Sequence, residues 1–217
     1  MRTVLVLLIL GVTLAGCKKG PQTVLAKAPP PTIPAGWTVH DVADGGFTIA
    51  APDNFKTDPG LGMEIVAPTA AESYGFADTE RSSELADESE PGKLSEAQKA
   101  KGYVLILYDR STRPIPGEER TKIEIKKESS SGTLKETADE VARTLGSGAQ
   151  RRTVKMPYGD VEEIIVQSRT VGGDEEKEIF YIICNGDDMF KIRMNSTNSP
   201  AAFDTIAIPV VETFRLK

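Results

Sequence analysis

Hydrophobic residues along much of the chain recur with the two-residue period of β-strands. Residues 122–128 alternate most cleanly, with Ile123 and Ile125 on one side and lysine or glutamate on the other, which is typical of a strand with one face on the core. Further strand-like runs lie at 37–42, 46–51, 63–67, 103–108, 152–156, 161–171, 178–184 and 189–195. Gly, Asp, Asn and Pro separate the last four runs, so the pattern predicts a meander of antiparallel hairpins.

Helical periodicity is confined to a few segments. Thr133 and Glu136 form a capping box in front of the clearest helix, which Gly146 should end. Its apolar stripe consists of Leu134, Ala138, Val141 and Leu145. A second helix should open at Pro200, and Pro209 is expected to kink it or end it near Ile208. Its stripe consists of Phe203, Ile206, Val210 and Phe214. Weaker helices are predicted at 78–86 and from Ser95.

The order of these elements predicts the α+β class. Strands come first, a helix crosses in the middle, a meander follows and a helix closes the chain, so we expect one antiparallel sheet covered by helices. The segment 68–100 differs from the rest, because it is rich in Ala, Ser, Asp and Glu and poor in large apolar residues. We expect a solvated low-complexity insertion there, with a ligand-gating lid as the alternative.

Residues 46–55, GFTIAAPDNF, resemble the opening G-F-x-I-x-x-P-x-x-F/W of the PsbP-like superfamily. That superfamily includes the photosystem II extrinsic subunit, a Ran-binding import factor and DcrB-like bacterial lipoproteins. The capped helix, the Met156–Gly159 turn before a long strand, the hairpin pair and the ending at 203–216 also match in order. The resemblance implies an α/β/α sandwich with a central antiparallel sheet. These motifs are structural and imply no particular activity.

The N-terminus predicts where the protein resides. Arg2 precedes an apolar run at 4–14, followed by small residues and Cys17, which is the pattern of a secretory signal peptide. The run is about half of the roughly 20 residues that a membrane-spanning helix needs. Leu14 to Cys17, LAGC, also resembles a bacterial lipobox, in which the cysteine is acylated and becomes the mature N-terminus. The alternative is an ordinary cleaved signal whose cysteine is incidental.

These features divide the chain into three parts. Residues 1–16 are the predicted lipoprotein signal peptide, 17–36 a lipidated Pro-rich tether, and 37–217 a single domain that contains the insertion at 68–100. Acyl chains such as palmitate contribute about 0.8 kcal/mol per buried CH₂, so several chains on Cys17 predict a stable lipid anchor in the cell envelope. Lys18 departs from the aspartate of inner-membrane retention signals, so we expect the outer membrane, facing the periplasm, in a Gram-negative host.

Composition narrows the function further. The chain has 32 acidic and 26 basic residues and a net charge of −6, which argues against a nucleic-acid partner because phosphates require a basic face. His40 is its single histidine, so there is no pair of histidines for a metal, and we expect it to lie at a solvent edge or to pair with Asp41. Nucleophile-elbow and phosphate-loop motifs are also absent from the sequence. We therefore expect a protein without enzymatic activity and without a cofactor.

Two acidic clusters are weak candidates for binding a hard cation. They lie at predicted hairpin tips and consist of Asp174, Glu175, Glu176, Asp187 and Asp188. Neither has the spacing of an EF-hand loop, so solvated turns are the simpler interpretation.

The sequence contains few other residues that indicate a reactive or binding role. Cys184 is expected to be a small buried hydrophobe, with a reactive thiol as the alternative. A groove between the sheet and a helix is a conceivable ligand site. The leading hypothesis is a non-catalytic envelope lipoprotein that acts as a protein-binding or scaffolding module. A small-molecule or cation-binding carrier is the alternative, and a hydrolase is the weakest hypothesis.

Overall fold

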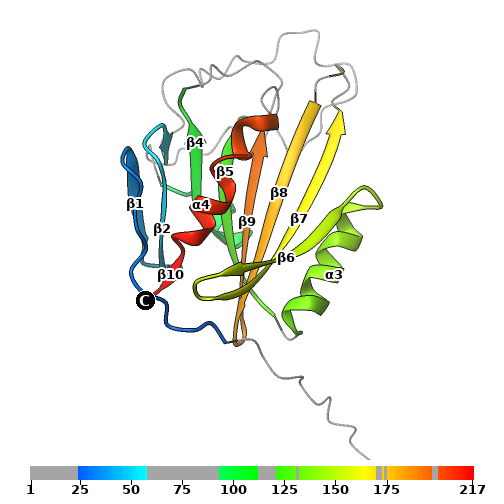
Figure 1. Ribbon diagram of the computed structural model, residues 1–217, viewed down its shortest axis with the longest axis horizontal. Coiled ribbons are helices and arrows are strands. Elements are labelled where there is room, and N and C mark those ends of the chain that lie inside the picture. The colour runs from blue at the N-terminus through cyan, green and yellow to red at the C-terminus, as the bar shows by residue number, and fades with distance from the viewer. Residues whose placement is uncertain are drawn as a thin grey trace, which may run out of the picture.

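The structure, a computed structural model, is mainly β (Figure 1). It describes residues 24–57, 93–111, 121–130, 132–169, 173, 175–196 and 200–217. About half of the described residues lie in strands and under a fifth in helices. The strands form two antiparallel sheets. The predicted α+β class, with an α/β/α sandwich around one central sheet, is therefore wrong.

The larger sheet has seven strands, and it contains the predicted meander. In spatial order its strands are β3 (Phe55–Lys56), β4 (Tyr103–Asp109), β5 (Lys122–Ser129), β9 (Asp188–Ser196), β8 (Glu175–Asn185), β7 (Gly159–Arg169) and β6 (Gln150–Met156). The hairpins β6–β7, β7–β8 and β8–β9 pair in sequence order. The long-range pairing of β5 with β9 then joins the meander to the earlier strands.

A second sheet of three strands covers part of the larger one. It consists of β1 (Trp37–Val42), β2 (Phe47–Pro52) and β10 (Arg215–Leu216), with β2 in the middle. The Thr213 hydroxyl accepts a hydrogen bond from Ala50 N at 2.8 Å and donates to Val210 O at 2.6 Å. This buried hydroxyl ties β2 to the helix that precedes β10.

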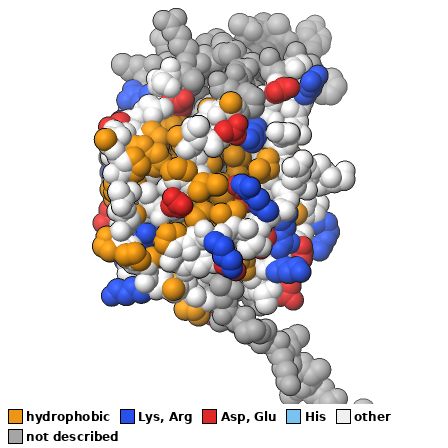
Figure 2. Space-filling view, in the orientation of Figure 1, with side chains coloured by type: hydrophobic (Ala, Val, Ile, Leu, Met, Phe, Trp, Pro, Cys, Tyr) orange, Lys and Arg blue, Asp and Glu red, His pale blue; other side chains and the backbone are white. Residues whose placement is uncertain are grey.

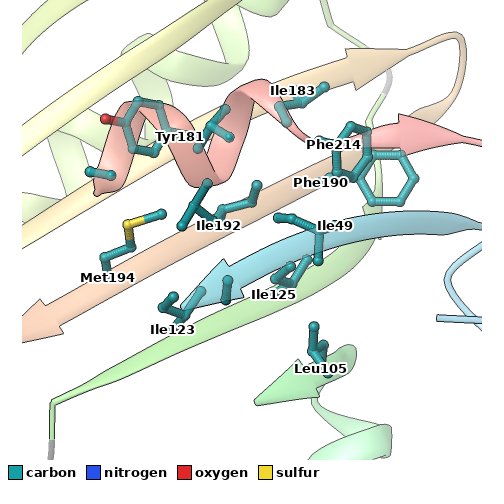
Figure 3. Close-up of a cluster of buried hydrophobic side chains, with 14 of the residues drawn as sticks. Ile49, Leu105, Ile123, Ile125, Tyr181, Ile183, Phe190, Ile192, Met194 and Phe214 are labelled. Atoms are coloured by element: carbon teal, nitrogen blue, oxygen red, sulfur yellow. The ribbon is translucent and has the colours of Figure 1, made fainter. Parts of the chain in front are cut away.

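The main hydrophobic core lies between the two sheets. Phe47 from β2 meets Phe190 and Phe214, with ring centroids 5.6 and 5.0 Å away, and Phe190 and Phe214 are 5.2 Å apart. Figure 3 shows Ile49 from β2 facing this cluster, with Ile192 beside it on β9. Aromatic and branched side chains of the predicted strands thus fill this core.

The C-terminal segment departs from its predicted single helix. It forms a 3₁₀ turn at Pro200–Phe203 and then the short helix α4 (Ala207–Glu212). Pro209 lies in the first turn of α4, where a backbone N–H has no intrahelical acceptor, so the ring is tolerated. The predicted ending near Ile208 is therefore wrong, although Phe203 and Val210 of the predicted stripe are fully buried.

The other described helices begin at their predicted caps. Ser95 caps α2 (Glu96–Ala100), and Thr133 caps α3 (Leu134–Leu145), each through a capping box. No helix in the described part of the chain is long and apolar enough to cross a membrane. The predicted signal peptide with Cys17, the strand at 63–67, the helix at 78–86 and residues 68–92 of the insertion at 68–100 lie outside the described residues.

The described half of the predicted tether is in contact with the domain. Leu25 and Ala28 pack against the main core, and Ala26 N donates a 2.8 Å hydrogen bond to Tyr158 O. We call residues 25–29 the N-terminal strap. In Figure 1 the strap runs past the tip of the β6–β7 hairpin before the chain turns into β1.

Candidate functional site

Along each strand of the seven-stranded sheet, successive side chains point to opposite faces of the sheet. The two faces have different surroundings. The core face, which carries Ile123, Tyr181 and Ile192, packs under the small sheet and α4. The α3 face carries Phe180 and Ile182, which pack with α3 in a second, smaller hydrophobic cluster. The helix covers β7 and β8, and a groove lies where this cover ends.

A groove of about 490 Å³ lies on the α3 face, between the helix and the end of the sheet where β5 and β9 meet. Phe180 and Met189 from the sheet and Val141 and Leu145 from the helix are its apolar lining. Its polar lining consists of Glu128, Ser129, Ser130, Glu136, Thr137, Glu140, Thr144 and Lys191. The groove lies between the sheet and a helix, where the sequence makes a ligand site conceivable, but its lining is mostly polar around a small apolar floor, whereas small-molecule sites are usually lined mainly by apolar side chains.

The start of α3 is fixed by local hydrogen bonds beside this groove. Thr133 N donates to Glu136 Oε2 at 2.9 Å, and Glu136 N donates to Thr133 Oγ1 at 3.3 Å. The hydrogen bond from the Thr133 backbone lowers the pKa of the Glu136 carboxyl, and the bond from its hydroxyl acts in the same direction. Ser130 N donates to Asp187 O at 2.8 Å, which ties the loop before α3 to the β8–β9 turn. This side of the groove is therefore held in place.

Cys184 lies beneath α3 and is only 2% exposed. Burial raises the pKa of its thiol, and a hydrogen bond with Thr137 partly opposes that shift. A buried thiol with a raised pKa is a poor nucleophile at neutral pH, because the thiolate is the reactive form. The structure thus places Cys184 as the small buried hydrophobe expected from the sequence.

Next to the groove, the α3 face carries a ladder of paired charges. The Glu124 side chain is 4% exposed and contacts Lys122 Nζ and Arg193 Nη1, each at 2.8 Å. Arg193 also pairs with Glu178, and Lys191 lies 3.6 Å from Glu128. We call these six residues the charged ladder. The alternating sequence predicted that Lys122 and Glu124 share a face, but Arg193, the second partner of Glu124, lies on β9 and cannot be identified from local spacing.

One buried carboxylate lies on the core face. Glu163 accepts a 2.7 Å hydrogen bond from the Tyr181 hydroxyl and pairs with Arg152. Burial raises the pKa of Tyr181, and the hydrogen bond to Glu163 adds to that effect. Sequence reasoning missed this cluster, since Glu163 follows Glu162 in the strand and local spacing does not identify Tyr181 and Arg152 as its partners. The polar groups of this cluster satisfy one another's hydrogen-bonding capacity, so the cluster has a structural role.

The sequence-predicted cation candidates do not come together. Glu175 and Glu176 begin β8, whereas Asp187 and Asp188 follow its far end, about 30 Å away at 3.3 Å per residue. Asp174 lies outside the described residues. Asp188 pairs with Lys127 at 3.0 Å, and Glu175 lies 3.7 Å from Arg169. The described residues contain no group of three His, Cys, Asp or Glu side chains able to hold a metal ion.

His40 is placed differently from its prediction. It lies opposite Ile49 in the β1–β2 ladder and so shares the inward side of the small sheet, while Asp41 pairs with Lys217. Its Nε2 atom is buried and accepts or donates no hydrogen bond among the described residues. Burial lowers the pKa of His40, and the charge of Lys56 lowers it further. His40 is therefore neither at a solvent edge nor paired with Asp41.

Comparisons with known proteins add a structural likeness. No family model matches the chain, and no curated protein matches it. A solved structure that is similar is the solution structure of cyanobacterial PsbP (CyanoP) from Synechocystis sp. PCC 6803, at 10% identity and a TM-score of 0.34. The match covers 84% of this chain and 94% of that chain. A structural neighbour of the chain is thus a PsbP protein, but at this TM-score the likeness informs neither the site nor the function.

Proposed function

We propose that this chain is a non-catalytic, lipid-anchored envelope protein of the DcrB-like lipoprotein kind, whose domain binds another envelope protein. The sequence at 14–17 supports the anchor, because small residues precede a cysteine directly after an apolar segment. The observation that carries the binding role is the hydrophobic surface around α4. Figure 2 shows hydrophobic side chains gathered over the middle of this face, with only a few charged groups among them.

The residues of this surface come from α4 and from the strands beside it. Ile206 and Ile208 are only partly buried, although they pack against the core. Val154 on β6 and Ile165 on β7 are also partly exposed, and both lie on the core face that α4 covers. Apolar surface of this kind gains about 25 cal/mol per Å² when a partner removes it from water. Contiguous exposed apolar patches commonly mark protein-binding sites.

The anchor is tested by replacing the acylated thiol. The Cys17→Ser protein should no longer be acylated, and it should move from the membrane to the soluble fraction. Mass spectrometry of the N-terminal peptide and membrane partition measure the two effects. Unchanged acylation or unchanged partition of the variant would refute the anchor.

The binding surface is tested by crosslinking in native membranes. A photoreactive amino acid at Ile206 should give a defined crosslinked product, and Ile208→Asp should reduce its yield at least several-fold because a charge disrupts an apolar contact. Thr144→Asp is the matched control, since it adds the same charge on α3, at the other face of the sheet. An equal yield in both variants, with both folded by circular dichroism, would exclude this surface.

The groove beside α3 favours a second function, that of a small-molecule or cation-binding carrier. Its apolar floor and charged lining would suit an amphipathic ligand more than a bare cation. Thermal-shift screening of the Cys17→Ser chain against metabolites and Ca²⁺ tests this role. A reproducible rise in Tm that Val141→Trp abolishes, by filling the groove, would support the carrier. If no compound in the screen raises the Tm, protein binding remains the better-supported function.

A further inference from the structure

The N-terminal strap is attached to both hairpin tips at one end of the domain. Leu25 N donates a 3.1 Å hydrogen bond to Asn185 Oδ1, which lies at the end of β8. Ala26 N donates to Tyr158 O, in the turn between β6 and β7. Two successive backbone N–H groups thus bind two different hairpins, which fixes the direction of the strap across them.

Side-chain contacts add to these bonds. The carbonyl oxygen of Pro29 accepts a 2.9 Å hydrogen bond from Arg215 Nε, and the Arg215 guanidinium lies 5.7 Å from the centre of the Tyr158 ring. The Leu25 side chain packs against Gly159, where an added Cβ would lie 3.6 Å from Leu25 Cδ2. The strap is therefore held by the β6–β7 turn, by the β8–β9 hairpin and by β10.

This attachment limits how far the domain can lie from the predicted lipid anchor. Leu25 lies eight positions after Cys17, and an extended chain spans at most about 3.5 Å per residue, or about 28 Å in all. If the chain were free as far as Trp37, the corresponding limit would be about 70 Å. The contacts of the strap thus reduce the reach of the domain more than twofold.

We infer that the strap orients the domain on a lipid surface, with the tips of the β6–β7 and β8–β9 hairpins toward the bilayer and the β7–β8 end away from it. The inference rests on the proposed acylation of Cys17. Figure 1 shows the strap and the β8–β9 turn at one end of the sheet and the β7–β8 end at the other. Val24, next to the strap, is an apolar side chain 73% exposed, which suits contact with the membrane interface. In this orientation the hydrophobic surface around α4 faces sideways, open to a neighbour in the same membrane.

Fluorescent labels at the two ends of the sheet test this orientation in the full-length acylated protein. Lys155→Cys and Arg169→Cys provide matched sites, because both replace exposed basic side chains that make one surface ion pair each. Lys155 pairs with Asp160 in the β6–β7 ladder, and Arg169 lies about 30 Å farther along β7 at 3.3 Å per residue. The proteins are reconstituted in phosphatidylethanolamine–phosphatidylglycerol vesicles that contain a headgroup-labelled acceptor lipid.

Energy transfer to the lipid should be several-fold higher from position 155 than from position 169. Leu25→Asp should remove most of this difference, because an aspartate cannot occupy the apolar contact of the strap, and Asn185→Ala should reduce it more mildly. Ala26→Asp is the matched control, since it adds the same charge at an exposed neighbouring side chain and keeps the backbone N–H. It should preserve the wild-type difference.

The outcomes separate the two proposals. Equal transfer from both positions in vesicle-bound wild-type protein would overturn the orientation and leave the anchor intact. A difference that survives in folded Leu25→Asp and Asn185→Ala would show that the strap does not set it. Protein that fails to bind the vesicles at all would instead refute the acylated anchor.

Discussion

The core face and the α3 face of the seven-stranded sheet are formed by alternate residues of the same strands, yet their side chains are stabilised in different ways. On β9, Phe190, Ile192 and Met194 are completely buried on the core face. Between them, Lys191 and Arg193 point to the α3 face and pair with Glu128 and Glu124. Along β9, the core face thus excludes water with apolar groups, and the α3 face matches charges across strands.

This difference indicates what each face contributes to the stability and the specificity of the fold. Apolar burial is not directional and provides most of the free energy of folding. A semi-buried ion pair adds little net stability, because desolvation offsets much of the attraction, but removing one partner is costly. The core face should therefore determine how stable the domain is, while the charged ladder should restrict which registers and contacts are allowed.

The largest expected effect comes from opening a cavity in the core face. Phe214→Ala removes a ring in contact with Phe47 and Phe190 and should lower the free energy of unfolding by about 3–5 kcal/mol. Phe180→Ala, on the α3 face, enlarges a groove that is already open and should cost clearly less. Urea denaturation measures both variants. Equal losses would show that the two faces contribute alike.

The charged ladder is tested by removing its central cation. Arg193→Met leaves the nearly buried Glu124 paired with Lys122 but without its arginine, and it should cost about 1–3 kcal/mol. The double variant Glu124→Leu/Arg193→Met should recover most of this loss, because a buried pair can often be replaced by apolar groups without penalty. Lys155→Met, which breaks an exposed pair with Asp160, serves as the control. A double variant less stable than Arg193→Met would contradict this view of the ladder.

A smaller effect is expected at the start of α3. Thr133→Ala removes the hydroxyl that accepts the Glu136 N–H and should cost about 1 kcal/mol. Thr144→Ala, at an exposed site in the last turn of the same helix, should be close to neutral. Thermal denaturation compares the two. If Thr133→Ala had no effect, the cap would not contribute to holding α3 over the sheet.

The smallest effect is expected from the titration of His40. Because burial lowers its pKa in the folded state, the unfolded chain binds the proton more readily. Stability should therefore fall as the pH drops below the ordinary value of 6.5, and the loss should level off below the folded pKa. His40→Gln should remove this component from the dependence of Tm on pH. An unchanged profile in the variant would assign the acid sensitivity to other groups.

Much of the local structure could be predicted from the sequence. The alternation at 122–128 correctly separated Ile123 and Ile125, which are fully buried on the core face, from Glu124. Thr133 and Glu136 predicted the start of α3 because a capping box is a local interaction. The resemblance to PsbP-like proteins and the leading functional hypothesis cannot be derived from such local patterns alone. The function is therefore a proposal.

The fold class was wrong because it depended on long-range pairing. β10 has only two residues, too few for a period to be visible, yet it completes a second sheet beside β2. Pro209 was expected to kink a helix or to end it near Ile208, and it instead lies in the first turn of one. The Glu124–Arg193 pair and the contact of Leu25 with Asn185 join residues far apart in sequence. The properties of the individual residues do not reveal which distant residues will pair.

The position of β2 has a consequence for the biogenesis of the protein. Ala50 and Thr213 are hydrogen-bonded across 163 residues of sequence, and β2 receives its second neighbour only from Arg215 and Leu216. A chain that emerges from the ribosome or a translocation channel N-terminus first cannot complete this sheet until those residues are released. Nascent or truncated chains would leave Phe47 and Phe190 without Phe214, exposed to chaperones and proteases. Folding of the domain should therefore be completed only after nearly the whole domain has been delivered.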